Sequence, residues 1–186
     1  MKLEYIANSS DTNKTVKDIL LTKFNISHRL LITLKRENCI LLNGNVINVS
    51  HTITENDNVS VSFSYEEDNT NIIPVKMPLD IIYEDDAYLV INKPYGIPVH
   101  PSMLHYEDSL SNGIRYYFDE INLKKKIRPV NRIDKDTSGL VIFAKNEYIQ
   151  ESLIKQMKDG KFKKEYIAIV EGHFSCQKRN YKCTYY

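Results

Sequence analysis

The stretch NRIDKDTSGL, residues 131–140, carries the strongest structural signal in the chain. Its polar second half is rich in turn-forming residues and runs through Gly139 into an apolar segment, LVIFA. If the first residues are extended, Arg132 and Asp134 point to the same side, and the guanidinium keeps the carboxylate ionised. A carboxylate oriented in this way can act as a covalent nucleophile. Composition alone favours an ordinary polar turn, so the surrounding sequence has to decide.

Length and composition indicate one ordinary globular domain or two small ones. The chain has 186 residues, of which 42% are hydrophobic and 26% charged. No stretch approaches the roughly 20 apolar residues of a membrane span, and the N-terminus lacks a secretory signal. Three cysteines cannot all pair, so nothing indicates a disulfide framework. We expect a cytoplasmic protein without a membrane segment.

Charge is unevenly distributed, although the net charge is only +1. Residues 66–120 hold 11 acidic and 3 basic side chains, whereas residues 124–164 hold 12 basic and 5 acidic ones. Such asymmetry can create a local field that attracts phosphates. The alternative is two solvated faces that differ in composition, and charge alone decides little between them.

Residues 12–63 are typical of two short helices followed by strands. The segment TVKDILLTKF has apolar residues at helical spacing behind Thr15, which we expect to be the N-cap. A second helix is expected to start at Ser27. In ILLNGNVIN, the Asn43-Gly44 pair predicts a two-residue hairpin turn. The alternating segment NVSVSF predicts a last strand.

This region resembles the alpha-L RNA-binding domain of the small-subunit ribosomal protein S-four type. The resemblance rests on the SHR helix start, the Leu34-Lys35 pair and the ILLNG turn. In that family the basic helix meets RNA phosphates, which implies phosphate contacts by Arg29, Lys35 and Arg36 here. An ordinary helix-and-hairpin domain with surface cations is the alternative, and this region alone does not separate the two.

Residues 64–78 are acidic, polar and bracketed by prolines, as is typical of a linker. After them, apolar runs at 79–83 and 87–92 flank the turn at 84–86 and predict a hairpin. A Pro/Gly-rich loop, KPYGIPVHP, and a helix near residues 109–118 follow.

Three further elements are expected from residue 139 onward. GLVIFAKN predicts a buried strand, and EYIQESLIKQMKDG predicts a helix capped by Asn146 and ended by Gly160. Its inward side chains are expected to be Ile149, Leu153, Ile154 and Met157. The segment KKEYIAIVEG is apolar on both faces from Tyr166 to Val170, which predicts a strand in the interior of a sheet.

Three blocks of the chain follow one another in the order and spacing of a known enzyme family. An opening strand and a Lys-Pro-x-Gly loop supply Lys93, Pro94, Gly96, His100 and Pro101. The central motif and the strand after it supply Arg132, Ile133, Asp134, Thr137, Ser138, Gly139, Leu140, Ala144 and Lys145. A last strand supplies Lys164, Tyr166, Ala168, Val170 and Gly172. Over residues 12–174 the chain is similar to large-subunit ribosomal RNA pseudouridine synthases of the A and D type.

The resemblance implies the chemistry and the site. Such enzymes convert uridine in RNA to its carbon-linked isomer without metal or cofactor, so RNA, first of all ribosomal RNA, is the expected partner. Asp134 would attack either the base or the ribose, and Arg132 would pair with Asp134 and help to place the flipped base. Tyr166 would contact the uracil; a core aromatic is its alternative. His100 is expected to shape a loop. A basic stretch would meet phosphates through Lys124, Lys125, Lys126 and Arg128.

The chain also departs from the family pattern. Asn131 stands where many members have histidine, and the terminal CQKRNYKCTYY resembles nothing in the family, whose catalytic domains run on further. With suitable codons, RNYKCTYY read one base later becomes Gly-Thr-Ile-Asn-Ala-Pro-Ile, which is common there. We therefore expect a truncated chain in which residues 178–186 are an out-of-frame tail. A genuinely divergent tail is the alternative.

The sequence thus predicts an α+β protein. An alpha-L RNA-binding domain over 1–63 is followed by a linker over 64–78 and by the first part of a mixed, antiparallel-rich catalytic domain over 79–177. We expect an RNA pseudouridine synthase that uses Asp134 and that truncation can leave inactive. The alternative is a non-catalytic RNA-binding protein that acts through its N-terminal domain.

Overall fold

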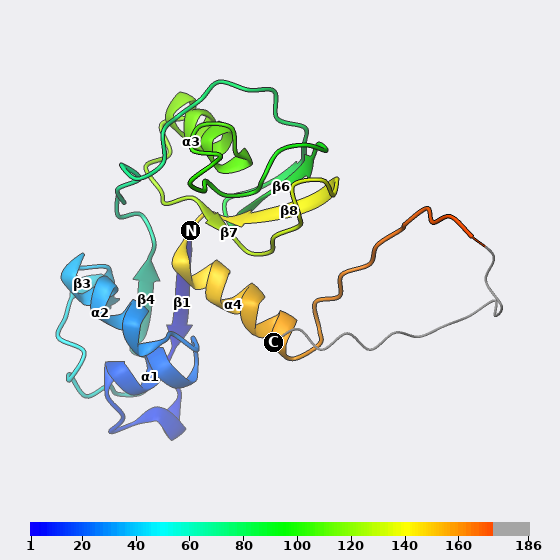
Figure 1. Ribbon diagram of the computed structural model, residues 1–186. Coiled ribbons are helices and arrows are strands. Elements are labelled where there is room, and N and C mark those ends of the chain that lie inside the picture. The colour runs from blue at the N-terminus through cyan, green and yellow to red at the C-terminus, as the bar shows by residue number, and fades with distance from the viewer. Residues whose placement is uncertain (173–186) are drawn as a thin grey trace.

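The structure, a computed structural model, describes residues 1–172. Two four-stranded antiparallel sheets form two units, each with its own hydrophobic core (Figure 1). This is the mixed α and β architecture that the sequence predicts. The expected out-of-frame tail, with Cys176 and Cys183, lies outside the described residues.

The N-terminal unit packs two helices against the first sheet. In spatial order its strands are β1 (Lys2–Ile6), β4 (Asn58–Ser62), β2 (Ile40–Leu42) and β3 (Asn45–Val46). A 3-10 turn, η1 (Ser9–Asp11), precedes the helices α1 (Val16–Thr22) and α2 (His28–Arg36). Apolar side chains of both helices are buried in one cluster with those of β4. Strand β1 was not indicated by the sequence pattern; it pairs with β4 along its whole length.

Local signals place these helices and the hairpin as predicted. The Thr15 hydroxyl accepts a hydrogen bond from the Asp18 amide at 3.2 Å, and Ser27 caps α2 through the Leu30 amide at 3.1 Å. Between β2 and β3, Asn43 and Gly44 have φ values of 50° and 82°. Both values lie in the left-handed region that a two-residue hairpin turn requires.

The second unit is a sheet with a helix on one face. In spatial order its strands are β5 (Ile81–Glu84), β6 (Tyr88–Lys93), β8 (Gly139–Ala144) and β7 (Arg128–Pro129). Helix α3 (Leu110–Glu120) covers this face (Figure 1). Its Ile114 and Phe118 are fully buried together with Leu89 and Phe143 of the sheet. The predicted hairpin, helix and strand are therefore confirmed. The motif of residues 131–140 leads into the first residues of β8.

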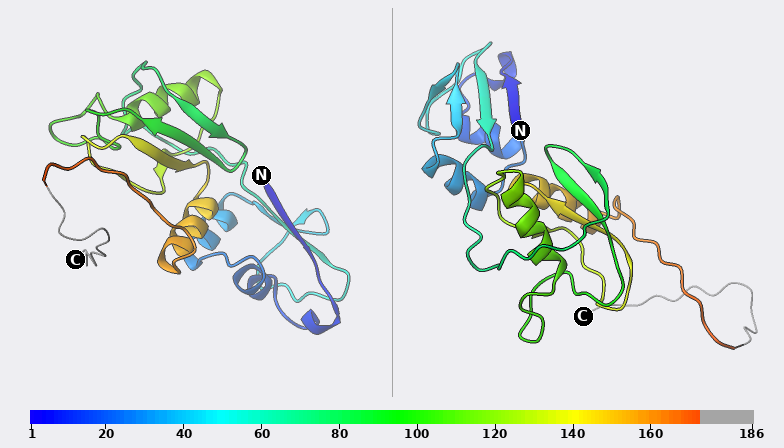
Figure 2. Two further views of the ribbon diagram at one scale, coloured as in Figure 1. Left: turned by 90° about the vertical axis from the view of Figure 1, so that its right-hand side faces the viewer. Right: turned by 90° about the horizontal axis from the view of Figure 1, so that it is seen from above.

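Helix α4 (Glu147–Lys158) connects the two units rather than filling a core. Asn146 caps it by accepting from the Ile149 amide at 2.9 Å, as predicted. The four apolar side chains expected to face inward are only partly buried. Figure 2 shows α4 beside α2, and two polar contacts join them: Ser27 to Glu151 at 2.8 Å and Arg29 to Glu147 at 3.2 Å.

The segment expected to be a linker is packed along the second unit. The Glu67 amide donates to the Lys124 carbonyl at 2.9 Å, and the Asn69 side chain accepts from the Ile127 amide at 2.9 Å. Tyr65, Asn69 and Ile72 are buried. Because its main chain and side chains are bonded in this way, the segment is a structured joint and not a free tether.

The strand predicted over residues 163–172 is not formed in this structure. Residues 163–171 have no regular secondary structure, and Ile167 and Ile169 are fully exposed. Its first part, residues 163–167, lines a hollow beside the motif of residues 131–140, and the stretch then runs out past the second unit (Figure 2). A strand needs a neighbour for its backbone hydrogen bonds, and within residues 1–172 no segment pairs with it.

Candidate functional site

Asn131 fixes the start of the central motif to strand β8. Its side-chain nitrogen Nδ2 donates to the Leu140 carbonyl at 3.0 Å, and its Oδ1 accepts from the Ile142 amide at 2.9 Å. The side-chain amide therefore occupies the hydrogen-bonding positions of a neighbouring strand. Because Asn131 is buried, this pairing sets where the following residues leave the sheet.

The side chain of Lys93 holds the loop of the motif by its backbone. This lysine is fully buried at the end of β6, and its Nζ donates to the carbonyls of Pro94, Ile97 and Lys135 at 2.9, 2.7 and 2.9 Å. Burial lowers the pKa of Lys93, while the nearby carboxylates of Asp136 and Asp134 oppose that shift. One ammonium group thus joins the Pro/Gly-rich loop to the loop that carries Asp134.

An open groove of about 850 Å³ lies between these two loops. Residues 98–102 line one side, and residues 129–135, with Arg132 and Asp134, line the other. Both of these side chains are exposed. The expected pairing is not formed: within residues 1–172, none of the ion pairs joins Arg132 to Asp134. The groove therefore presents an accessible carboxylate and an accessible guanidinium separately.

His100 lines the same groove and has a defined support. Its Nδ1 lies 3.3 Å from the Ser111 hydroxyl, which itself donates to the Val99 carbonyl at 2.7 Å. Partial burial and the positive charge of Arg132 lower the pKa of His100. Both influences favour the neutral form of the imidazole.

Tyr166 does not reach the Asp134 groove. It lines a neighbouring hollow of about 480 Å³ together with Ile133 and Leu140, and 62% of its surface is exposed. The sequence-based expectation that Tyr166 would share one site with Asp134 and Arg132 is not met in this structure. The reason is the missing strand, which would have been needed to position the ring.

Two of the four cations expected to meet RNA between 124 and 128 are instead buried. The Lys125 ammonium donates to the carbonyls of Phe63, at 2.7 Å, and Tyr65, and it lies 4.3 Å from the centre of the Tyr65 ring. The Arg128 guanidinium forms an ion pair with Glu67, and both side chains are nearly inaccessible. Their charges are satisfied inside the joint, so neither group is presented to a phosphate.

The other predicted RNA-binding cations lie at the surface. Lys124 and Lys126 are exposed, with Lys124 3.1 Å from Glu66. On α2, the exposed cations are Arg29, Lys35 and Arg36. Arg36 and Lys126 line one groove of about 780 Å³, which also contains the acidic side chains of the joint. The fold therefore brings two distant basic segments to one face.

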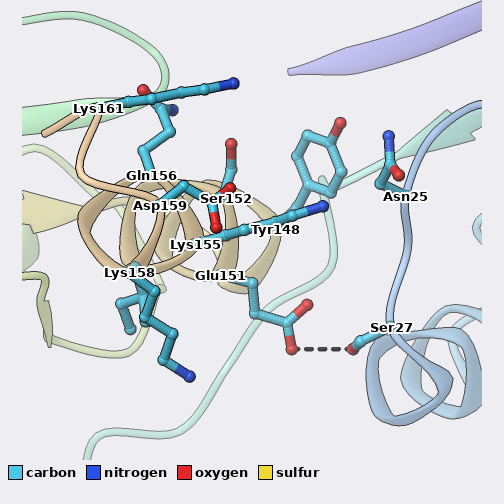
Figure 3. Close-up of a pocket in the computed structure, with 11 residues that line it drawn as sticks. Asn25, Ser27, Tyr148, Glu151, Ser152, Lys155, Gln156, Lys158, Asp159 and Lys161 are labelled. Atoms are coloured by element: carbon cyan, nitrogen blue, oxygen red, sulfur yellow. Dashed lines mark hydrogen bonds between the residues drawn. The ribbon is translucent and has the colours of Figure 1, made fainter.

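A further hollow lies at the junction of the two units, away from the motif. It has a volume of about 550 Å³ and lies between the loop before α2 and helix α4 (Figure 3). Figure 3 shows the Ser27–Glu151 hydrogen bond at its edge. Within the described part of the chain, no cluster of three metal-ligating side chains occurs, and no helix is long and apolar enough to cross a membrane.

Comparison with known families decides the assignment. The family of RNA pseudouridylate synthases matches residues 87–184, a range that includes the Lys93 loop, the groove and the Asp134 motif. The chain belongs to this family. It is 36% identical over 162 residues to the ribosomal large subunit pseudouridine synthase D of Borreliella burgdorferi, covering 84% of this chain and 49% of that protein.

Other pseudouridine synthases give a similar picture. The corresponding protein of Blochmanniella floridana is 34% identical over 178 residues, which are 94% of this chain and 52% of that protein. The chain therefore spans about half the length of these relatives. Among solved structures, the human RNA pseudouridylate synthase domain containing 1 matches 44% of this chain and 28% of its own, with 24% identity and a TM-score of 0.36.

The sequence motifs located the groove but not its supports. Lys93, Asn131 and His100 all fall within matched blocks, yet no pattern indicated what their side chains bind. For Lys93 the sequence does offer one signal. A lysine at the end of an apolar strand, directly before a proline-rich loop, is expected to be buried there only if its ammonium group has a specific partner.

Proposed function

We propose that this protein isomerises uridine to pseudouridine in RNA, first of all ribosomal RNA, with Asp134 as the nucleophile. The reaction breaks the bond from uracil N1 to ribose C1′ and forms a bond from C5 to C1′. The proton lost from C5 is balanced by one gained at N1, so substrate and product have the same composition. The isomerisation therefore needs no external oxidant, reductant or group donor.

The placement of Asp134 is the observation that carries this proposal. Its carboxylate is exposed in a groove, and the backbone around it is held by Asn131 on one side and Lys93 on the other. A nucleophile must be both accessible and fixed in direction. Arg132 and Lys135, from the same loop, provide positive charge for the phosphates of an extruded nucleotide.

The RNA-binding role is assigned to the exposed cations only. We propose the unit of residues 1–63 as an alpha-L-type RNA-binding domain, with Arg36 joined by Lys126 across their shared groove and with Lys35 exposed on the same helix. Arg29 takes part once it leaves Glu147, because its guanidinium is otherwise paired. This proposal also places the protein in the cytoplasm, with ribosomal RNA.

A pair of matched variants tests the catalytic assignment. The chain is incubated with large-subunit ribosomal RNA, and pseudouridine is mapped by base-specific chemical modification. Asp134→Asn should abolish product, whereas Asp136→Asn, an exposed carboxylate in the same turn, should retain it. Equal activity of Asp134→Asn and the unmodified chain would overturn the role of Asp134.

The same experiment addresses the non-catalytic alternative. An RNA-binding protein without activity would bind ribosomal RNA in a salt-dependent manner and form no pseudouridine at any uridine. In that case Lys126→Ala should still make the plot of log affinity against log salt concentration less steep, by about 0.7 for single-stranded RNA. Binding and catalysis are therefore scored separately.

A further inference from the structure

The loop between β6 and α3 exposes large apolar side chains beside the Asp134 groove. Pro101 and Ser102, at the base of this loop, line the groove. At its tip, Met103 is 100% exposed and Leu104 is 90% exposed. Neither side chain belongs to either hydrophobic core of residues 1–172, so packing within this part of the chain does not account for apolar residues at these two positions.

The tip is held in place rather than left loose. Ser102 and His105 exchange two backbone hydrogen bonds of 3.1 and 3.0 Å, which close a tight turn around the two apolar residues. His105 Nδ1 lies 2.7 Å from the Asp108 carboxylate, and Lys135 Nζ lies 3.1 Å from His105 Nε2. Because the Lys135 ammonium can only donate, Nε2 is the acceptor and Nδ1 carries the proton toward Asp108.

This chain of contacts fixes the tip relative to the nucleophile. Lys135 directly follows Asp134, and its backbone carbonyl is held by Lys93. The side chain of Lys135 therefore holds the apolar tip through His105, while its main chain is held by Lys93 next to Asp134. A displacement of the tip would have to break the Lys135–His105 contact.

We propose that Met103 and Leu104 form an apolar wedge that enters the RNA stack beside the target uridine and occupies the space vacated by its base. The inference rests on the proposed function, because a uridine must leave its stack to reach the groove. Apolar side chains that insert between bases are an established way to unstack a nucleic acid. The adjacent cations Arg132 and Lys135 suit the phosphates on either side of the gap.

The test compares a stacked target with an unstacked one. The double variant Met103→Ser, Leu104→Ser is measured on a hairpin RNA with the target uridine inside the stem and on an unstructured oligonucleotide with the same uridine. We expect a loss of about tenfold or more in rate on the hairpin and less than about twofold on the oligonucleotide. Ile82→Ser, which alters an exposed apolar residue on β5, should change neither rate.

Base extrusion is measured independently of chemistry. A 2-aminopurine placed next to the target should brighten when the unmodified chain or Asp134→Asn binds the hairpin, and should stay dark with the double variant. If the unmodified chain forms no pseudouridine but still gives this signal, and the double variant does not, the wedge stands and the synthase proposal fails. If the double variant extrudes the base normally, or loses the same rate on both RNAs, the wedge is wrong.

Discussion

The buried ammonium of Lys93 donates a 2.9 Å hydrogen bond to the backbone carbonyl of Lys135, the residue that follows Asp134. Two more carbonyls, of Pro94 and Ile97, complete its coordination. A single side chain at the end of β6 therefore sets the geometry of both loops that form the groove. The contact is to main chain, so it does not depend on the side chain present at position 135.

Replacing Lys93 by methionine should damage both stability and catalysis. The substitution keeps most of the volume but leaves three partly buried carbonyls without their donor, and we expect a loss of about 1–3 kcal/mol in the free energy of unfolding. The freed loop should lower the rate of pseudouridine formation by up to about 100-fold. Urea unfolding and single-turnover kinetics measure the two effects. Lys135→Ala keeps the carbonyl and should leave stability within about 0.5 kcal/mol.

Asn131→Leu should show what the side-chain amide contributes. The substitution is close in size but removes the donor to Leu140 and the acceptor for Ile142, and we expect a loss of about 1–3 kcal/mol in the free energy of unfolding. Hydrogen exchange of the Ile142 amide should accelerate together with that loss. An unchanged exchange rate at Ile142 would contradict the assigned role.

Lys125 and Lys126 are neighbours in sequence with opposite expected behaviour. Lys125→Met removes a buried cation that binds the carbonyls of Phe63 and Tyr65, so the free energy of unfolding should fall by about 1–3 kcal/mol. Lys126→Met alters an exposed cation and should leave stability unchanged while weakening RNA binding. Thermal unfolding and filter binding at two salt concentrations separate them. If Lys126→Met lowered stability and Lys125→Met weakened RNA binding instead, the burial of Lys125 in the joint would be wrong.

Asp11 should make the N-terminal unit sensitive to acid. Hydrogen bonds from Lys14, at 2.8 Å, and from Tyr5, at 2.6 Å, hold the pKa of this carboxyl far below its usual 3.8. A depressed pKa in the folded state stabilises the protein fully above pH 3.8, and this stability is lost progressively as the pH falls below that value. Asp11→Asn should therefore destabilise the chain at pH 7 and much less at pH 2.

Urea unfolding at the two pH values measures this difference. The exposed Glu55, changed to glutamine, serves as the control and should alter stability little at either pH. An equal destabilisation by Asp11→Asn at pH 7 and pH 2 would mean that packing, and not the charge of Asp11, is responsible.

The sequence by itself determined the features that depend on neighbours along the chain. The cap at Thr15, the helix start at Ser27 and the Asn43-Gly44 turn all follow from local backbone chemistry, so their patterns are sufficient. The family followed from the order of three motifs. None of this required knowing which distant segments meet.

Only the tertiary structure decided which charged side chains are available. Lys125 and Lys126 have the same chemistry in sequence, yet one is enclosed by the carbonyls of a segment some 60 residues away and the other is exposed to solvent. The apolar run around Tyr166 likewise predicts a strand, but no strand forms without a neighbouring segment to pair with it. Both outcomes depend on long-range hydrogen bonding, because a buried polar group is stable only beside a partner that local sequence does not identify.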